Sequence, residues 1–141
     1  MKVNGSYKVA KWQEAPFDEI SPNSRLTRAS VEYECSGGIE GKAAVEYLMF
    51  YSHFDAKDQH NSSATYVGLI RFEGKINGKR GGMVLRDNGA FQGGTASSEL
   101  QIAAGSGSGE LKGITGKGIY RADRNGCSIE LSYDVRPESG S

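Results

Sequence analysis

Two carboxylates that interrupt apolar segments are the residues of this chain best suited to chemistry. Glu46 stands within the apolar run 43–51, and Asp87 ends an alternating segment that contains Met83 and Leu85. A carboxyl group in an apolar cavity has a raised pKa and can act as a general acid or base. We therefore predict Glu46 and Asp87 as catalytic candidates, with Asp87 at the mouth of the fold.

The alternative role for Glu46 is structural. Pairing Ser52 with Ala64 across the expected hairpin places Glu46 opposite Ile70, with Arg71 next along the strand. A register slip of one residue would let Glu46 and Arg71 form a buried ion pair, and structural ion pairs also perturb pKa values. Arg71 could instead be exposed at the rim of an oligomer.

Other polar and aromatic side chains could bind a ligand, and four of them are our candidates: Trp12, Arg28, Tyr66 and Arg71. The segment 53–60 holds two His and two Asp, but its spacing matches no metal motif, so we predict no metal and no cofactor. The glycine-rich run 105–113 resembles a phosphate loop, yet a strand follows it instead of a helix. We expect this run to be tight backbone packing.

Alternation of apolar and polar residues predicts the elements that must position these side chains. Eight strands are expected: Val3–Trp12, Leu26–Cys35, Ile39–Ser52, Ala64–Gly74, Arg80–Asp87, Thr95–Ala103, Gly116–Ala122 and Cys127–Val135. Turns such as Asn77-Gly78 supply the positive φ angles of hairpins. No stretch has the period of a crossover helix, so the strands should be antiparallel. Closure would remove their exposed edges.

We therefore predict an all-β fold, a closed eight-stranded antiparallel up-and-down β-barrel, with a two-sheet sandwich as the alternative. In this topology the two long connections, Gln13–Arg25 and His53–Ser63, lie at the same end, where we place the mouth of any pocket. Cys35 and Cys127 lie at opposite ends, too far apart for a disulfide.

The predicted strands 39–52 and 64–74 are apolar on both faces. One face would fill the barrel, and no helix is available to cover the other. A second copy of the chain is the simplest cover, so we predict a homo-oligomer built on these two strands.

Composition limits the class of protein. The chain has 141 residues with seventeen basic and seventeen acidic side chains. This length fits one domain, residues 1–136, followed by a disordered tail, residues 137–141. A net charge of zero argues against nucleic acid as a partner. The sequence shows neither a membrane span nor a secretory signal, and two reduced thiols suit the cytoplasm.

Several ordered blocks resemble a known family. They are residues 11–14, 26–29, 45–49, 66–74, 106–111 and 131–135. Together they are similar to the bacterial domain-of-unknown-function family numbered 3224, which is assigned to the allene oxide cyclase-like barrels. That resemblance implies an eight-stranded barrel whose relatives include cyclases and dirigent proteins acting on small hydrophobic molecules, but no established activity.

The recurring residues of the family that match here are Arg28, Glu46 and Arg71. The chain departs from the pattern at Asp87, where a His is expected, and at Glu99, where a Trp is usual. Its connection 53–63 is also longer than typical. These departures bear on any chemistry shared with the family at the mouth.

Three functions remain open from the sequence. The first is a barrel that binds a small hydrophobic or aromatic molecule without a cofactor. The second is a cofactor-independent isomerase or cyclase, in which a cavity carboxylate moves a proton. The third is a structural or interaction module whose barrel is filled by its own side chains. An eight-stranded barrel can be filled or can hold one ligand, so the fold alone does not choose.

Overall fold

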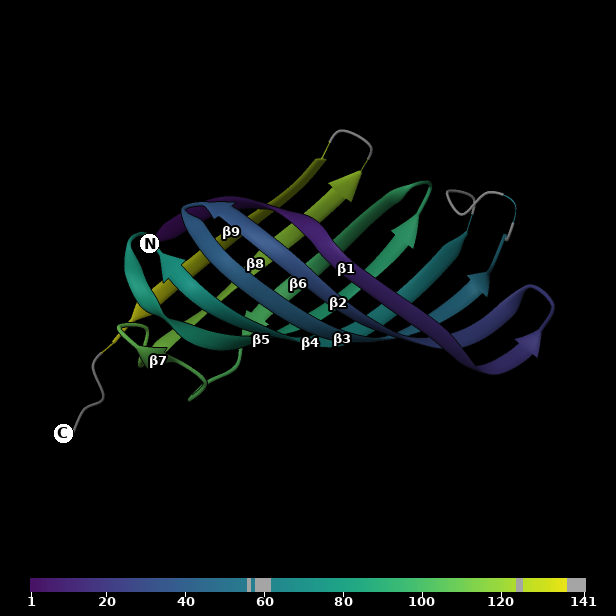
Figure 1. Cartoon of the computed structure of the whole chain (residues 1–141), viewed down its shortest axis with the longest axis horizontal. Coiled ribbons are helices and arrows are strands. Elements are labelled where there is room, and N and C mark those ends of the chain that lie inside the picture. Colours follow the sequence, from purple (N-terminus) through teal and green to yellow (C-terminus); the bar gives the residue numbers. More distant parts are fainter. Residues whose placement is uncertain (56, 58–61, 124–125, 137–141) are drawn as a thin grey trace.

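The computed structural model describes residues 1–55, 57, 62–123 and 126–136. Its elements are antiparallel β-strands (Figure 1). They are β1 Lys2–Ser21, β2 Ser24–Gly37, β3 Ile39–His53, β4 Ser63–Ile76, β5 Lys79–Gln92, β6 Thr95–Ile102, β7 Ser108–Gly109, β8 Ile114–Asp123 and β9 Gly126–Val135. The predicted tail 137–141 lies outside the described residues.

The strands form one sheet that rings through eight of them. Neighbours in the chain pair from β1 to β6, β6 pairs with β8, β8 with β9, and β9 returns to β1. The ninth strand, β7, is two residues long and pairs with β5. The prediction of an all-β, antiparallel sheet that closes on itself is therefore confirmed. A single ring contradicts the sandwich alternative, which requires two sheets.

The ring is joined over only a short length between its first and last strands. Within the described chain, β1 pairs with β9 over Lys2–Gly5 alone, whereas its pairing with β2 continues to Ser21. Three register shifts bend β1 along this further length, and Pro16, which has no backbone N–H to donate, stands there. Bulges and proline are typical of strand edges that do not pair. The free part of β1 thus forms one edge of an opening in the ring.

Two sequence predictions of strand boundaries were wrong. The segment Gln13–Arg25 is a hairpin that turns at residues 22–23 and not a long loop, because the backbones of β1 and β2 stay paired along it. Strand β5 continues past Asp87 to Gln92 and pairs there with β4 and β6. Asp87 therefore lies within a strand and not at its end.

The pairing of β3 with β4 differs by one residue from the predicted one. Tyr51, not Ser52, stands opposite Ala64, so Glu46 faces Leu69 instead of Ile70. The difference arises at a register shift between Tyr51 and His53, where Ser52 is the extra residue of β3. This shift does not bring Glu46 into an ion pair with Arg71.

The β1–β2 turn and the connection after β3 do meet at one end of the molecule, as predicted for these two segments. The backbone N–H of Phe54, just after β3, donates to the carbonyl oxygen of Asn23 between β1 and β2, at 2.7 Å. In Figure 1 this end lies opposite the end that carries β7. The part of the connection at residues 56 and 58–61 lies outside the described residues, and so does much of the histidine and aspartate segment considered for a metal.

The opposite end is closed by the glycine-rich run. Ser108 of β7 accepts from the N–H of Gly82 through its hydroxyl at 3.1 Å, and Leu111 is fully buried beneath it. A Cβ atom on Gly81 would collide with the Ser108 carbonyl oxygen. The prediction of tight backbone packing here is confirmed.

Alternation separates the inner and outer faces of β3 and β4. Val45, Tyr47 and Met49 are buried inside, whereas Leu48 and Val67 are about half exposed outside, at 54% and 53%. Both cysteines are free thiols, as expected. Within the described chain, no helix has the length and apolar character needed to cross a membrane.

Candidate functional site

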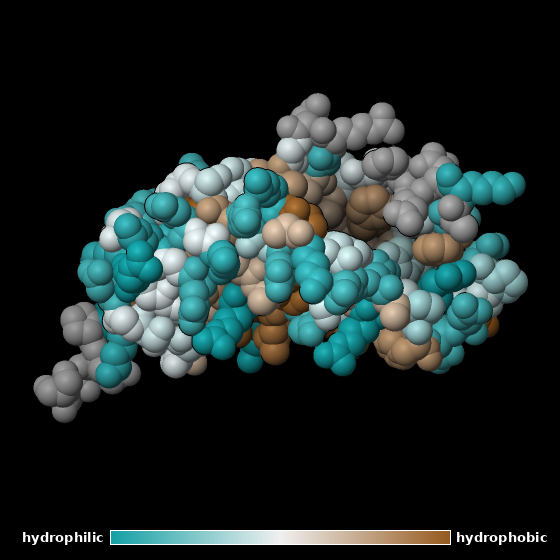
Figure 2. Space-filling model, viewed as in Figure 1, coloured by the Kyte–Doolittle hydropathy of each residue, from teal (hydrophilic) through white to brown (hydrophobic). Residues whose placement is uncertain are grey.

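A partly open cavity of about 660 Å³ lies inside the ring, towards the end where the β1–β2 turn meets the connection after β3. Fifteen residues line it: Trp12, Glu14, Pro16, Arg25, Thr27, Tyr33, Tyr47, Met49, Tyr51, Phe54, Ser62, Tyr66, Phe91, Ala96 and Tyr120. In the space-filling view, hydrophobic side chains in brown line a hollow on the upper side of the molecule (Figure 2). The volume is within the range of small-molecule pockets.

Aromatic rings form most of the cavity wall. The chain has seven Tyr, five Phe and one Trp, and eight of these thirteen residues line the cavity. The rings pack on one another: Tyr47 lies 5.2 Å from Tyr66 and 6.5 Å from Trp12 between ring centroids. Gly68 leaves the space for the Tyr47 ring, since a Cβ atom there would lie 2.7 Å from it. The wall is therefore a contiguous aromatic surface.

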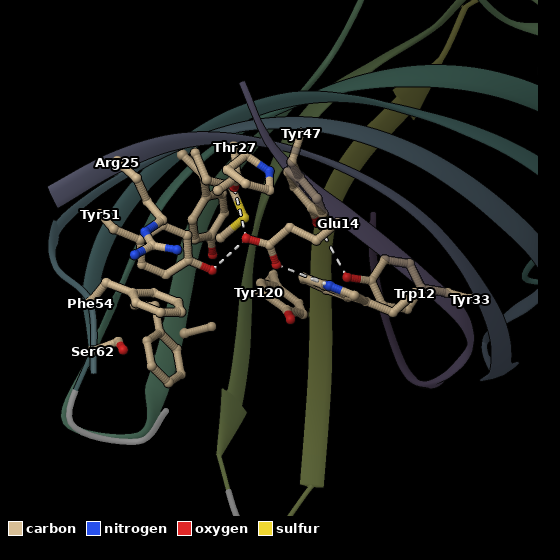
Figure 3. A pocket seen from close by; sticks show the side chains of 15 residues that line it. Trp12, Glu14, Arg25, Thr27, Tyr33, Tyr47, Tyr51, Phe54, Ser62 and Tyr120 are labelled. Atoms are coloured by element: carbon tan, nitrogen blue, oxygen red, sulfur yellow. Dashed lines mark hydrogen bonds between the residues drawn. The ribbon is translucent and has the colours of Figure 1, made fainter. Parts of the chain in front are cut away.

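Glu14 is a carboxylate on the free edge of β1 that points into this cavity (Figure 3). Its Oε2 accepts hydrogen bonds from the hydroxyls of Thr27 and Tyr51, both at 2.7 Å. Its Oε1 accepts from the indole N–H of Trp12 at 3.1 Å. Three neutral donors from β1, β2 and β3 thus satisfy the carboxylate and hold its neighbours in place.

Arg25, at the start of β2, is the cation of the cavity wall. Its guanidinium carbon lies 3.9 Å above the centre of the Phe54 ring, a cation–π contact. Its Nε atom is buried, and no described residue accepts a hydrogen bond from it. The positive charge also opposes the effects of burial and of Glu14, which raise the pKa of Tyr51.

Asp87 lies behind the cavity wall and is 2% exposed. The Tyr47 hydroxyl donates to its Oδ2 at 2.9 Å, and the Tyr33 oxygen lies 3.4 Å from that of Tyr47. No described residue is hydrogen-bonded to its Oδ1. Burial raises the pKa of the Asp87 carboxyl above its usual range, although the hydroxyls of Ser98 and Tyr47 act in the opposite direction.

Close backbone packing supports this buried polar group. The hydroxyls of Tyr66 and Ser98 lie 2.6 Å apart, and burial raises the pKa of Tyr66 to about 12. Gly89 faces Tyr66 across β4 and β5, and a Cβ atom there would lie 2.7 Å from the Tyr66 hydroxyl. A glycine is therefore required for the two hydroxyls to meet.

The structure brings together three of the six residues predicted from the sequence. Trp12 and Tyr66 line the cavity, and Asp87 contacts it through Tyr47. Asp87 is buried and not at the mouth, because β5 continues past it. Its position on the inner face follows from the alternation with Met83 and Leu85.

The other three predicted residues lie on the outer face. Glu46 accepts from Ser30 at 2.5 Å and pairs with Arg28 at 3.4 Å, while Arg71 pairs with Glu73 at 2.9 Å. The charged side chains of these pairs are all exposed, and Glu46 is on the opposite face from Tyr47. The prediction of Glu46 as a cavity carboxylate is wrong in its placement, and Arg28 and Arg71 do not reach the cavity. The hydrogen bond from Ser30 and the charge of Arg28 lower the pKa of Glu46.

Glu14, Arg25 and Tyr51 were missed because two of them belong to a segment that was predicted to be a loop. Continuing the alternation of β1 from Trp12 would have placed Glu14 on the same face. Extending the predicted strand Leu26–Cys35 by one residue reaches Arg25, which lines the cavity together with Thr27. The alternation was present in the sequence. The segment is polar, lacks glycine and shows no strong apolar period, so it was not recognised as strand.

An all-β protein whose ring of antiparallel strands encloses an aromatic cavity is the class that this fold and site define. The model of the family described as "Protein of unknown function (DUF3224)" matches residues 3–133, so the chain belongs to that family. A crystal structure of a protein of unknown function from the same family, from Shewanella oneidensis MR-1, is similar over 98% of each chain, with 23% identity and a TM-score of 0.74. This similarity shows the shared fold. No curated protein matches the chain.

Proposed function

We propose that this protein binds one small aromatic or apolar molecule inside its ring of strands. The observation that supports the proposal is the partly open cavity of about 660 Å³ with eight aromatic rings in its wall. Rings packed by their neighbours offer a large apolar contact area at a small cost in conformational entropy. The cavity argues against the alternative that the interior is filled by its own side chains.

We further propose that the protein belongs to the allene oxide cyclase-like superfamily and that it is cytoplasmic. The ring of eight antiparallel strands is compatible with the allene oxide cyclase-like barrels, the superfamily implied by the resemblance. Two free thiols are compatible with a reducing cytoplasm.

Trp12 provides a direct test because it is the single tryptophan of the chain and lies in the cavity wall. Titration with biphenylacetamide, a neutral two-ring probe, should change Trp12 fluorescence with a saturable 1:1 isotherm. Ala96→Phe places a ring in the cavity and should abolish the change. Ser97→Phe adds the same ring to the exposed face of the same strand, and should bind like the wild type.

The proposal fails if the isotherm does not saturate, or if both variants respond alike. Circular dichroism of the two variants checks that each retains the β-fold. A response that persists in Ala96→Phe would place the probe elsewhere on the surface.

A cofactor-independent isomerase is the second candidate, and the buried carboxyl of Asp87 favours it. Asp87 has a raised pKa and is connected to the cavity by Tyr47, so Tyr47 could pass its proton to Asp87 while it takes one from a bound molecule. A carbon acid that binds in the cavity, such as biphenylacetone, would then exchange hydrogen for deuterium in heavy water. Asp87→Asn should bind this probe and lose the exchange; exchange at the uncatalysed rate with the wild type would dismiss this candidate.

A further inference from the structure

The two opposite charges in the cavity wall differ in how far the protein itself satisfies them. Glu14 accepts three hydrogen bonds, from Trp12, Thr27 and Tyr51. Three charge-assisted bonds occupy most of the acceptor positions of a carboxylate. Glu14 therefore acts within the protein, as the group that holds three wall residues in their orientations.

Arg25 has no such compensation. In the part of the chain that the structure describes, it forms no ion pair within 4.0 Å, and its buried Nε has no acceptor. Among the described residues, its guanidinium stacks on the face of the Phe54 ring. A partly buried cation whose Nε–H has no acceptor is destabilised, and an anion from outside the chain would offset that cost.

The position of Arg25 fixes how such an anion would lie. Arg25 is the second residue of β2, next to the β1–β2 turn. This turn contacts Phe54, in the connection between β3 and β4. The aromatic wall extends inward from there to Tyr47 (Figure 3), whose ring packs on that of Tyr66. A ligand with its charged group at Arg25 would thus place an apolar body against the rings of the interior.

We infer that the cavity selects an aromatic monocarboxylate, whose carboxylate group is bound by the guanidinium of Arg25 and whose rings pack on the aromatic wall. A guanidinium presents two parallel N–H donors that match a carboxylate. This inference rests on the proposed function, because it names the chemical class of the ligand for the same cavity.

A matched series of three probes tests the charge preference at neutral pH: biphenylacetate, biphenylacetamide and biphenylethylamine. They share the same rings and differ in the charge of one end group. Binding is measured by isothermal titration calorimetry and by Trp12 fluorescence. We expect the carboxylate to bind about tenfold more tightly than the amide, which corresponds to about 1.4 kcal/mol, and the amine to bind most weakly.

Two arginine variants locate the preference. Arg25→Met should reduce biphenylacetate affinity about tenfold, to that of the amide, while the amide affinity stays unchanged. Arg28→Met removes an equal charge from the exposed outer face of the same strand, where Arg28 pairs with Glu46, and should leave all three affinities unchanged.

Each other result would overturn the inference. Equal affinity for carboxylate and amide would leave the proposed binding function in place and remove Arg25 as the selecting group. Tightest binding of the amine would assign selection to Glu14. A carboxylate preference that survives in Arg25→Met, or is lost equally in Arg28→Met, would exclude a local role of Arg25. Absence of binding by all three probes would reject the inference and the proposed function together.

Discussion

Asp87 is the one ionisable acidic residue that is buried in the described part of the chain. Asp87 is 2% exposed, and its Oδ1 has no hydrogen bond among the described residues. Its Oδ2 accepts the hydrogen bond from Tyr47. The hydroxyl of Tyr47 supports the charged form, but burial has the larger effect and raises the pKa. Asp87 therefore links the chemistry of the interior to the stability of the fold.

This link gives a pH dependence whose sign is fixed. The pKa of Asp87 is higher in the folded than in the unfolded chain, so the folded protein holds this proton more tightly. Its contribution to stability is complete below the ordinary aspartate pKa and is lost as pH rises through the folded pKa. We expect Asp87→Asn to be more stable than the wild type at pH 8, with a smaller difference at pH 4.

Urea denaturation at the two pH values measures this difference. Asp134→Asn, at an exposed position on β9, is the control and should show no such change between the two pH values. A difference that is the same at both pH values for Asp87→Asn would contradict the account.

The residue scale also shows why the sequence predicted some site residues and not others. Asp87 alternates with Met83 and Leu85 and so shares their buried face. Around Tyr66 both faces of the strand are apolar. Around Glu46 both faces are apolar, and alternation cannot tell inside from outside. The predicted β3–β4 register was also wrong by one residue, so the expected neighbours of Glu46 on β4 were wrong as well.

At the scale of elements, the closed end of the ring depends on the short run between β6 and β8. Leu111 in this run is 0% exposed and packs beneath β7, which pairs with β5 through Gly81 and Gly82. The sequence predicted this packing correctly, because its glycines admit no helix and leave little room for side chains. Closing this end restricts access to the cavity to the other end and to the free edge of β1.

We expect Leu111→Ala to lower the free energy of unfolding by about 2–5 kcal/mol, the usual cost of an emptied leucine site in a core. Ile119→Ala removes a similar side chain that is 59% exposed on β8, and should change stability by less than about 0.5 kcal/mol. Chemical denaturation of both variants provides the comparison. Similar losses in the two would show that the run does not close the core.

The long β1–β2 hairpin is the element that sequence analysis described least well. Its residues were assigned to a loop because polar residues and Pro16 interrupt the apolar period. In the structure, pairing with β2 sustains the strand despite three register shifts. The polar residues hide the continuing alternation of the two strands, and the cavity residues Glu14 and Arg25 were missed with it.

At the scale of the whole molecule, an apolar patch remains on the outer face of β3 and β4. It consists of Leu48, Phe50, Val67 and Leu69, of which Leu48 and Val67 are directly paired. Glu46 lies on one side of the patch, and the exposed Arg86 lies across from Leu69 on the other. A two-fold contact whose axis runs along the strands would place Glu46 of one copy opposite Arg86 of the other.

We propose this patch as the contact surface of the predicted homo-oligomer. We expect the wild-type protein to sediment as an oligomer at micromolar concentration and Leu48→Lys to sediment as a monomer with the same circular dichroism spectrum. Exposed apolar area is the driving force, and a buried lysine would remove it. A monomeric wild-type protein would contradict the prediction.

Native mass spectrometry of the protein with biphenylacetate tests the central claim, that the ring holds one small molecule in its aromatic cavity, most directly. The account predicts one bound probe per chain for the wild type and for Ser97→Phe, and none for Ala96→Phe. An absence of adducts with the wild type, or an equal adduct with Ala96→Phe, would contradict it.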